Sequence, residues 1–409
     1  MNRFGLNSTL SGKWHFLILA LPFFGFLMIT RLAFLPIVDE HLFHLKTIEQ
    51  FASSFPIFNL KDYPSASGPL PYVFWAILGK LIGFELWKLR FLTVFISYLG
   101  SVLFFRTCQE QKVSFPLLKT LLLIFFPYIF LYSFTIYTIN FALFWEIFSL
   151  RYFLRYVESQ SSADLTWGSM GSLALVLSRQ LDVALPVGAF CFFLLGKHLK
   201  KPSAVFLSMA PILGFLLLVT YWKGMTPPRF QTALSPSLKL THFTLLLTVI
   251  GFYFQPVGLL EGWRLKRWAA VFPLLFIPYL LIFHVPYPEE GLGIVYYGID
   301  LIGRKIYSGL AGMLPLYLGM VGGLVFYGIG RGIWESGKLP LLSYVLLFYL
   351  LFNCLNPFVY ERHYYFAWPL ILLLLPREVS GNRFLLMSVL VILTGISIFY
   401  VKLLAVFPK

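Results

Sequence analysis

Two adjacent carboxylates and two histidines form the first cluster of ionisable side chains: Asp39, Glu40, His41 and His44. They follow an apolar run at residues 14–35 that is long enough to span a membrane. Ionisable groups at a membrane surface are costly to place and usually functional. We therefore interpret Asp39 and Glu40 as candidate catalytic residues, one of them a general base. The alternative is a solvated loop start that only marks the membrane boundary.

The two histidines lie three residues apart, so they share one face if the segment is helical. With Asp39 or Glu40 they could hold a divalent cation such as Mg²⁺ or Mn²⁺, but His-x-x-His alone is a weak metal signal. We favour His44 as a hydrogen-bond partner of the carboxylate or of a sugar. The sequence thus predicts no dedicated metal site and no certain cofactor, with a divalent cation as the open alternative.

Two polar stretches further along interrupt the apolar sequence. Arg179 and Gln180 lie between two apolar runs, close to Asp182, and Arg362 and His363 precede a late run. The planar fork of arginine donates hydrogen bonds in pairs, which suits phosphate. We predict that Arg362 and His363 form an outward-facing anion site and that Arg179 faces the same cavity as the first loop. A structural Arg179–Asp182 pair is the alternative.

The composition indicates the class of protein. Of the 409 residues, 59% are hydrophobic and only 12% are charged, and the mean hydropathy is +0.80. A soluble domain carries about 25% charged residues, so we predict an all-α polytopic membrane protein with one domain over residues 1–409. The net charge of +15 comes from basic residues scattered between apolar runs, which fit cytoplasmic loops and anionic lipids better than nucleic acid.

About thirteen apolar runs can serve as transmembrane helices. They cover residues 14–35, 89–106, 115–133, 138–155, 166–180, 182–196, 203–222, 241–259, 268–284, 309–330, 339–356, 365–376 and 384–401. The first is expected to be retained, because no signal-peptide cleavage site follows it. The run at 70–84 is short and contains proline and glycine, so we predict a helix lying on the outer surface.

The basic clusters between the spans orient the chain. If 70–84 does not cross, these clusters fall on one side, which the positive-inside rule makes cytoplasmic. The amino terminus then lies inside. The outward-facing segments are the first outer loop at 36–88, the turn at 133–138, the turn near Arg179, and the loops at 223–240, 285–308 and 356–364.

These features together suggest one kind of chemistry. A carboxylate base and an arginine anion site facing outward beside a bilayer suit a sugar linked through phosphate to a polyprenyl lipid. The polyprenyl tail would lie between spans, the phosphate would meet Arg362, and the acceptor hydroxyl would meet Asp39. Hydrogen-bond donors can stabilise the leaving phosphate, and a base opposite the leaving group inverts the anomeric centre.

The order of the motifs resembles the dolichyl-phosphate-glucose α-1,2-glucosyltransferase family. VDEHLFH followed by YPSASGPLPY is similar to its first luminal loop, and LSRQLDVALP to an Arg-Gln segment. THFTLLLTVIGFYF is similar to a His-Phe span start, and ERHYYFAWPL to its closing motif. The resemblance implies a GT-C-like helical bundle, the architecture of multi-span transferases that use polyprenyl-phosphate sugars, with juxtamembrane helices in the first outer loop.

The resemblance also implies roles for individual residues. Asp39 matches the catalytic acid of the family, and Glu40 accompanies it. The implied substrate-binding residues are His44, Tyr63, Ser65, Ser67, Tyr72, Arg179, Gln180, Arg362 and His363. The implied activity is inverting transfer of glucose or another hexose from a polyprenyl- or dolichyl-phosphate donor to a lipid-linked glycan or other acceptor. The site would face the periplasm from a bacterial inner membrane, or the lumen from the endoplasmic reticulum membrane.

Three other functions stay open. A transporter or flippase of a lipid-linked or amphipathic solute would need polar groups near the bilayer midplane, whereas the predicted ionisable groups gather at one surface. A lipid-linked oligosaccharide polymerase or ligase usually has a very large late outer loop, whereas the late loops here, such as 285–308, are short. The third is a structural subunit without activity.

Overall fold

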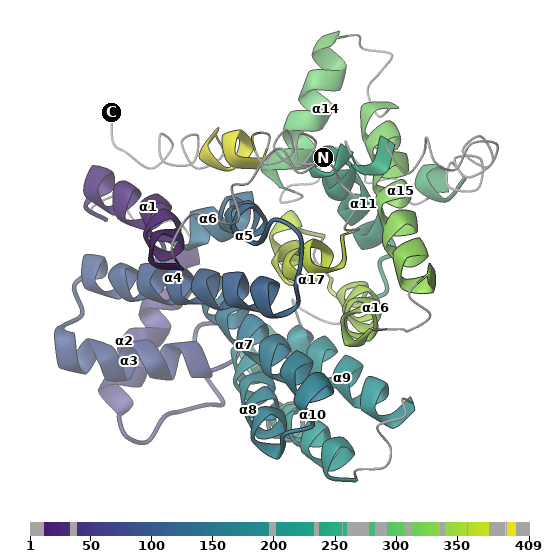
Figure 1. Cartoon of the computed structure of the whole chain (residues 1–409). Helices are drawn as coiled ribbons and strands as arrows, with labels where there is room; N and C mark the ends of the chain where they lie inside the picture. Colours follow the sequence, from purple (N-terminus) through teal and green to yellow (C-terminus); the bar gives the residue numbers. More distant parts are fainter. Residues whose placement is uncertain are drawn as a thin grey trace. The chain divides into compact units, whose positions relative to one another are not determined.

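In the computed structural model the described part of the chain is helical and contains no β-strand (Figure 1). The described residues are 12–32, 39–195, 202–232, 237–255, 257–259, 278–282, 293–306, 313–335, 340–357, 359–375, 389 and 391–397. They form two compact units. Unit 1 comprises Met1–Ser235, Leu341–Tyr349 and Gly395–Lys409, and unit 2 comprises Pro236–Pro340 and Leu350–Thr394. The single membrane domain expected over the whole chain stays a prediction.

Within the described part of the chain, three helices are long and apolar enough to cross a membrane: α4 (Leu86–Glu110), α10 (Pro202–Trp222) and α15 (Met313–Glu335). Shorter apolar helices accompany them, among them α1 (Gly12–Thr30) and α11 (Thr241–Tyr253). In a bilayer every backbone polar group must be satisfied internally, which a helix achieves within one segment. The all-α polytopic class expected from the composition is confirmed.

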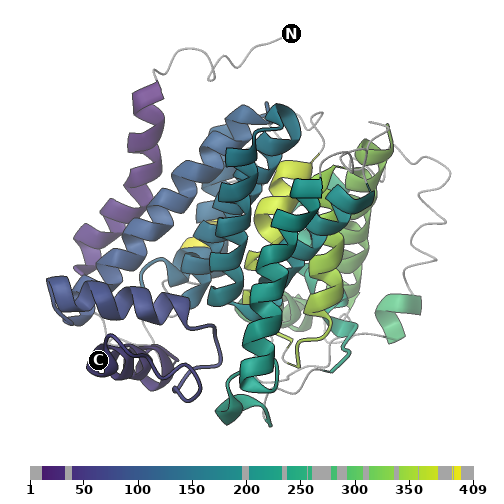
Figure 2. The ribbon, with the colours of Figure 1, turned by 90° about the horizontal axis from the view of Figure 1, so that it is seen from below.

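The helices of unit 1 follow the predicted spans closely. Besides α1, α4 and α10, they include α7 (Thr138–Ser159), α8 (Ser162–Ser178) and α9 (Ala184–Leu195). α8 lies beside both α7 and α10 (Figures 1 and 2). The span predicted at 115–133 is instead two helices, α5 (Pro116–Ile124) and α6 (Pro127–Tyr132). The break falls at Pro127, which has no N–H to continue the first helix and is suited to start the second.

The first outer loop is largely helical, as expected. It contains a π-helical turn, η1 (Glu40–Leu45), then α2 (Lys46–Ser54) and α3 (Leu70–Ile82). Phe51 of α2 and Tyr72 and Trp75 of α3 share one buried cluster. Burying one such side chain stabilises the fold by about 1.5–3 kcal/mol. The same cluster includes Phe141 of α7 and Trp222 of α10, so the packing fixes the loop against these helices and holds its polar side chains in place.

Unit 2 is built on α11 and α15, which pack against each other. They can approach closely because Gly322 has no side chain, and a Cβ there would collide with the backbone of α11. It also contains α14 (Ile294–Ile306), the carboxyl end of α16 (Leu341–Asn353) from Leu350 onward, η7 (Glu361–Tyr365) and α17 (Ala367–Leu374). The sequence predicted a loop at 285–308, but its described part forms α14. The buried Glu361 caps this helix by accepting hydrogen bonds from the Val295 and Tyr296 N–H groups. The spans predicted at 268–284 and 384–401 lie largely outside the described residues.

Candidate active site

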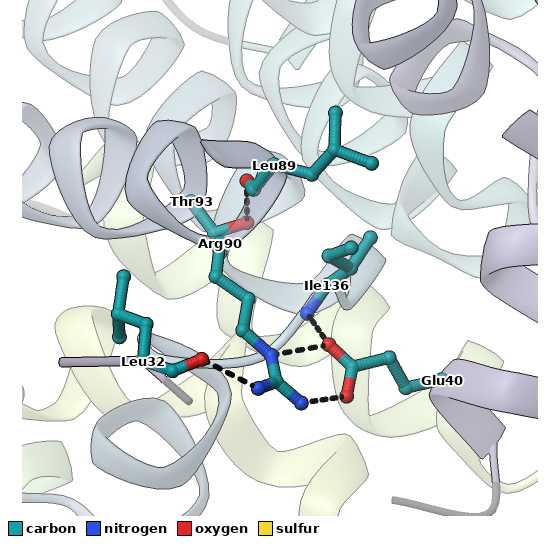
Figure 3. Close-up of polar contacts among 6 residues, drawn as sticks. All are labelled: Leu32, Glu40, Leu89, Arg90, Thr93 and Ile136. Atoms are coloured by element: carbon teal, nitrogen blue, oxygen red, sulfur yellow. Dashed lines mark hydrogen bonds and ion pairs between the residues drawn. The ribbon is translucent and has the colours of Figure 1, made fainter. Parts of the chain in front are cut away.

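Glu40 is a fully buried carboxylate held by an arginine (Figure 3). Arg90 of α4 donates from Nε to Oε1 at 3.0 Å and from Nη2 to Oε2 at 2.6 Å. The Ile136 N–H donates to Oε1 at 2.8 Å, and Arg90 Nη1 donates to the Leu32 carbonyl oxygen at 2.9 Å. A buried charge is tolerated when it is paired in this bidentate way. The pair ties together the residues after α1, the first loop, α4 and the turn before α7.

Asp39 lies in a different environment from its neighbour. Its side chain is half-buried, and the Tyr137 hydroxyl donates to Oδ2 at 2.8 Å. The Tyr137 ring stacks on Tyr132, with centroids 4.1 Å apart, and meets His44 edge-on at 4.5 Å. Asp39 is thus a partly accessible carboxylate fixed by a rigid aromatic residue.

His44 faces inward and joins a chain of hydroxyl groups. Its Nδ1 lies 2.6 Å from the Tyr72 hydroxyl, which lies 2.6 Å from Ser65 Oγ. Burial raises the pKa of Tyr72, and it raises the pKa of Tyr63 well above its ordinary value. Both phenols are therefore neutral near pH 7 and serve as hydrogen-bonding groups. His41, by contrast, is exposed.

The segment from Tyr63 to Gly68 docks against the end of α8. Tyr63 donates its hydroxyl proton to the Ser67 carbonyl oxygen at 2.7 Å, and Ser67 Oγ lies 3.2 Å from Thr138 Oγ1. The Gly68 N–H donates to the Ser178 carbonyl oxygen at 3.0 Å. Gly68 is required here because a Cβ at this position would collide with the Leu177 carbonyl group. The second polar stretch is thereby fixed beside the Arg179 segment.

Arg179 and Gln180 complete this cluster. Gln180, in the 3-10 turn η2 (Gln180–Val183), donates from Nε2 to the Ala66 carbonyl oxygen at 3.2 Å. Arg179 Nη1 lies 3.5 Å from Thr138 Oγ1. Burial has the largest effect on the pKa of Tyr72 and raises it, and hydrogen bonds with Ser65 and Ser67 lower it. The charge of Arg179 also lowers this pKa, and the charge of Asp39 raises it. The half-buried carboxylate of Asp39 and the half-buried guanidinium of Arg179 therefore both act electrostatically on one hydroxyl.

Arg362 and His363 form a separate polar cluster in unit 2. The Arg362 guanidinium carbon lies 4.6 Å from the centre of the Tyr360 ring. The Asn356 amide donates to His363 Nδ1 at 2.9 Å, and the Asn356 carbonyl oxygen accepts from His242 Nε2 at 2.9 Å. Arg362 and His363 are both half-buried. A cation stacked on an aromatic ring beside a fixed imidazole can bind an anion.

The structure gathers nine of the sequence-predicted site residues in unit 1 and two in unit 2. The nine are Asp39, Glu40, His44, Tyr63, Ser65, Ser67, Tyr72, Arg179 and Gln180. Among the described residues, no group of three or more histidine, cysteine or acidic side chains could hold a metal ion. The divalent cation stays an untested alternative.

Sequence reasoning missed three residues of the cluster: Arg90, Tyr137 and Thr138. A signal existed for Arg90, because a lone arginine near the end of an apolar run needs a partner. Tyr137 and Thr138 end the aromatic segment at 127–138, in which no residue was predicted to belong to the site. Their partners lie 41 to 98 residues away in the chain.

No known protein family and no curated protein matches the sequence. The fold is similar to the crystal structure of ArnT from Cupriavidus metallidurans in the apo state, with a TM-score of 0.44 and 12% sequence identity. The match covers 95% of this chain and 78% of that chain.

Proposed function

We propose that the protein is a GT-C-like inverting glycosyltransferase that moves a hexose from a polyprenyl phosphate to an acceptor hydroxyl. The observation that supports this most is the unit 1 cluster, in which the partly accessible Asp39 and Arg179 contact the consecutive residues Tyr137 and Thr138. Displacement at a sugar–phosphate bond needs a base for the acceptor and positive charge for the leaving phosphate. Both requirements can be met within this cluster.

The proposed roles follow from the two environments of the acidic pair. Asp39 takes the proton of the acceptor hydroxyl, and Glu40 anchors the loop through Arg90. Arg179 contacts the donor phosphate, while the hydroxyls of Ser65, Ser67 and Tyr72 offer hydrogen bonds to the sugar. The sequence assigned the phosphate to Arg362. We retain Arg362 as the competing phosphate ligand, and the two arginines can be separated by mutation.

A donor screen tests the proposal directly. Purified full-length protein is incubated with a panel of polyprenyl- and dolichyl-phosphate hexoses and a native membrane-lipid extract, and products are identified by mass spectrometry. We expect an acceptor lipid that gains one hexose in an enzyme-dependent way, with glucose as the first candidate donor. NMR of the product then establishes whether the anomeric centre is inverted. A monodisperse protein that modifies nothing with any donor would contradict the proposal.

One observation favours a transporter as the second candidate. Glu146, in the middle of α7, is fully buried, and its carboxylate oxygens have no hydrogen-bond partner among the described residues. Asp182, itself buried, lies within electrostatic range. Acidic groups inside a membrane domain often serve ion-coupled transport. Translocation of a fluorescent polyprenyl-phosphate sugar in proteoliposomes, abolished by Glu146→Gln and unaccompanied by sugar transfer, would favour this function.

A further inference from the structure

Ile136 and Tyr137, the two residues before α7, donate hydrogen bonds to the two consecutive acidic residues of the first loop. The Ile136 N–H donates to Glu40 Oε1 at 2.8 Å, and the Tyr137 hydroxyl donates to Asp39 Oδ2 at 2.8 Å. The turn after α6 thus contacts both carboxylates, one through the backbone and one through a side chain. Only the side-chain contact can be removed by mutation without altering the backbone.

Tyr137 is held rigidly from two sides. Its ring lies nearly parallel to Tyr132, with an interplanar angle of 20°, and meets His44 edge-on at 67°. Only 6% of Tyr137 is exposed. Aromatic pairs of this kind contribute about 0.5–1.5 kcal/mol beyond simple burial. The hydroxyl therefore has a fixed position before any substrate binds.

We propose that Tyr137 is the positioning residue of Asp39: its hydroxyl fixes the orientation of the carboxylate and keeps it charged and ready to accept a proton. This inference rests on the proposed role of Asp39 as the base. A hydrogen bond donated to a carboxylate favours the ionised form over the protonated one. A base in a half-buried site needs this support, because burial alone favours the neutral acid.

The other ionisable groups around Asp39 come from each neighbouring element. Glu40 lies beside it in the chain, but its charge is paired with Arg90 of α4. His44 of η1 contacts the Tyr137 ring, and Tyr72 of α3 interacts electrostatically with Asp39. Arg179 acts on the same Tyr72 hydroxyl and favours negative charge in this region. Tyr137 is the neighbour whose hydroxyl contacts the Asp39 carboxylate through an identified hydrogen bond.

Chemical labelling tests the inference without any substrate. A water-soluble carbodiimide with glycinamide converts protonated carboxyl groups to amides, and peptide mass spectrometry locates them. Full-length protein in detergent is labelled at a series of pH values as wild type, Tyr137→Phe and Tyr132→Phe. We expect half-maximal labelling of Asp39 to move to higher pH by about one unit in Tyr137→Phe. Tyr132→Phe keeps the stacked ring and is the matched control, with the wild-type labelling curve expected.

Glu40 provides an internal reference, because its buried ion pair should resist the reagent in all three proteins. Superimposable Asp39 labelling curves for wild type and Tyr137→Phe would overturn the inference. If Tyr137→Phe does not fold, incorporation of 3-fluorotyrosine at position 137 keeps the shape and strengthens the hydroxyl as a donor. The labelling curve should then move to lower pH, and an unchanged curve would again overturn the inference.

A kinetic arm separates this inference from the proposed function. With the donor found in the screen, Tyr137→Phe should shift the acidic limb of the pH profile of kcat/KM to higher pH and leave the donor KM unchanged. An Asp39→Asn protein with full activity would refute the proposed base, whatever the labelling shows. A labelling curve that does not move, in an enzyme that needs Asp39, would refute only the role of Tyr137.

Discussion

At the scale of single residues, the two adjacent acids illustrate how surroundings divide the roles of similar groups. Neighbouring residues on a helix point about 100° apart, so Asp39 and Glu40 cannot readily reach the same hydroxyl. Glu40 points into the fold and is neutralised by Arg90. Asp39 keeps partial access to solvent and accepts a hydrogen bond from a neutral phenol. A carboxylate locked in a buried ion pair is a poor base, whereas Asp39 can still take up a proton.

Conservative substitutions of the two acids should therefore affect different properties, turnover for Asp39 and stability for Glu40. Asp39→Asn preserves size, so we expect folding to be intact and turnover to fall by about 10²-fold or more. Glu40→Gln leaves the buried Arg90 without its charge partner, and loss of one partner of a buried pair costs about 3–5 kcal/mol. We therefore expect a lowered melting temperature in detergent. A stable Glu40→Gln protein with greatly reduced turnover would reverse the two assignments.

The two candidate phosphate ligands can also be compared residue for residue. We expect Arg179→Ala to raise the donor KM more than Arg362→Ala does, because Arg179 belongs to the same cluster as Asp39. Loss of a hydrogen bond to a charged group costs about 1.5–3 kcal/mol, or roughly 10- to 150-fold in affinity. Steady-state kinetics with varied donor and fixed acceptor measures the effect. A larger donor effect for Arg362→Ala would support the assignment made from the sequence.

At the scale of elements, the site depends on the docking of one loop segment onto one helix end. Residues 63–68 are held by the Gly68 N–H bond to Ser178 and by the Gln180 bond to Ala66. These contacts join the first outer loop to the end of α8, more than 100 residues later in the chain. The serine hydroxyls of this segment are positioned only if the backbones approach this closely.

Gly68→Ala tests this docking. The added methyl group would meet the Leu177 carbonyl group, so the segment must shift away from α8. We expect a loss of transfer activity together with faster proteolysis within residues 59–69. Gly25→Ala in α1 is the matched control, because nothing lies within 4 Å of its added methyl group. Equal activity for Gly68→Ala and wild type would show that the segment does not contribute to the site.

The helices themselves were largely predictable, because apolar runs of sufficient length have few alternatives to a membrane helix. The helix at 70–82 and the break at Pro127 also follow from local sequence. α14 was missed, because its start depends on a cap from Glu361, which lies 65 residues later. Arg90 could be recognised as needing a partner, but the partners of Arg90 and Tyr137 could not be identified. Their roles depend on partners brought together by packing, which spacing along the chain does not reveal.

At the scale of the whole molecule, length and charge constrain how the chain crosses the bilayer. α4 has 25 residues, and at about 1.5 Å per residue it reaches roughly 37 Å, more than the ~30 Å hydrocarbon core. Its two ends should therefore lie on opposite sides of the membrane. Lys61 precedes α3 and α4, and Lys112 follows α4 directly; both are exposed. If α4 crosses and α3 does not, Lys61 and Lys112 lie on opposite sides of the membrane. If α3 also crosses, both lysines lie on the same side.

Cysteine accessibility settles this arrangement. α3 has only 13 residues, about 20 Å of helix, which is shorter than the ~30 Å hydrocarbon core. We therefore expect α3 to lie along the outer surface without crossing. In a protein with Cys108, Cys191 and Cys354 replaced, a membrane-impermeant maleimide applied to intact cells should label a cysteine at position 61. A cysteine at position 112 should react only after the membrane is permeabilised. Labelling of position 112 from outside would place the basic segment after α4 on the same side as Asp39, contrary to the positive-inside rule, and the proposed outward-facing site would have to be abandoned.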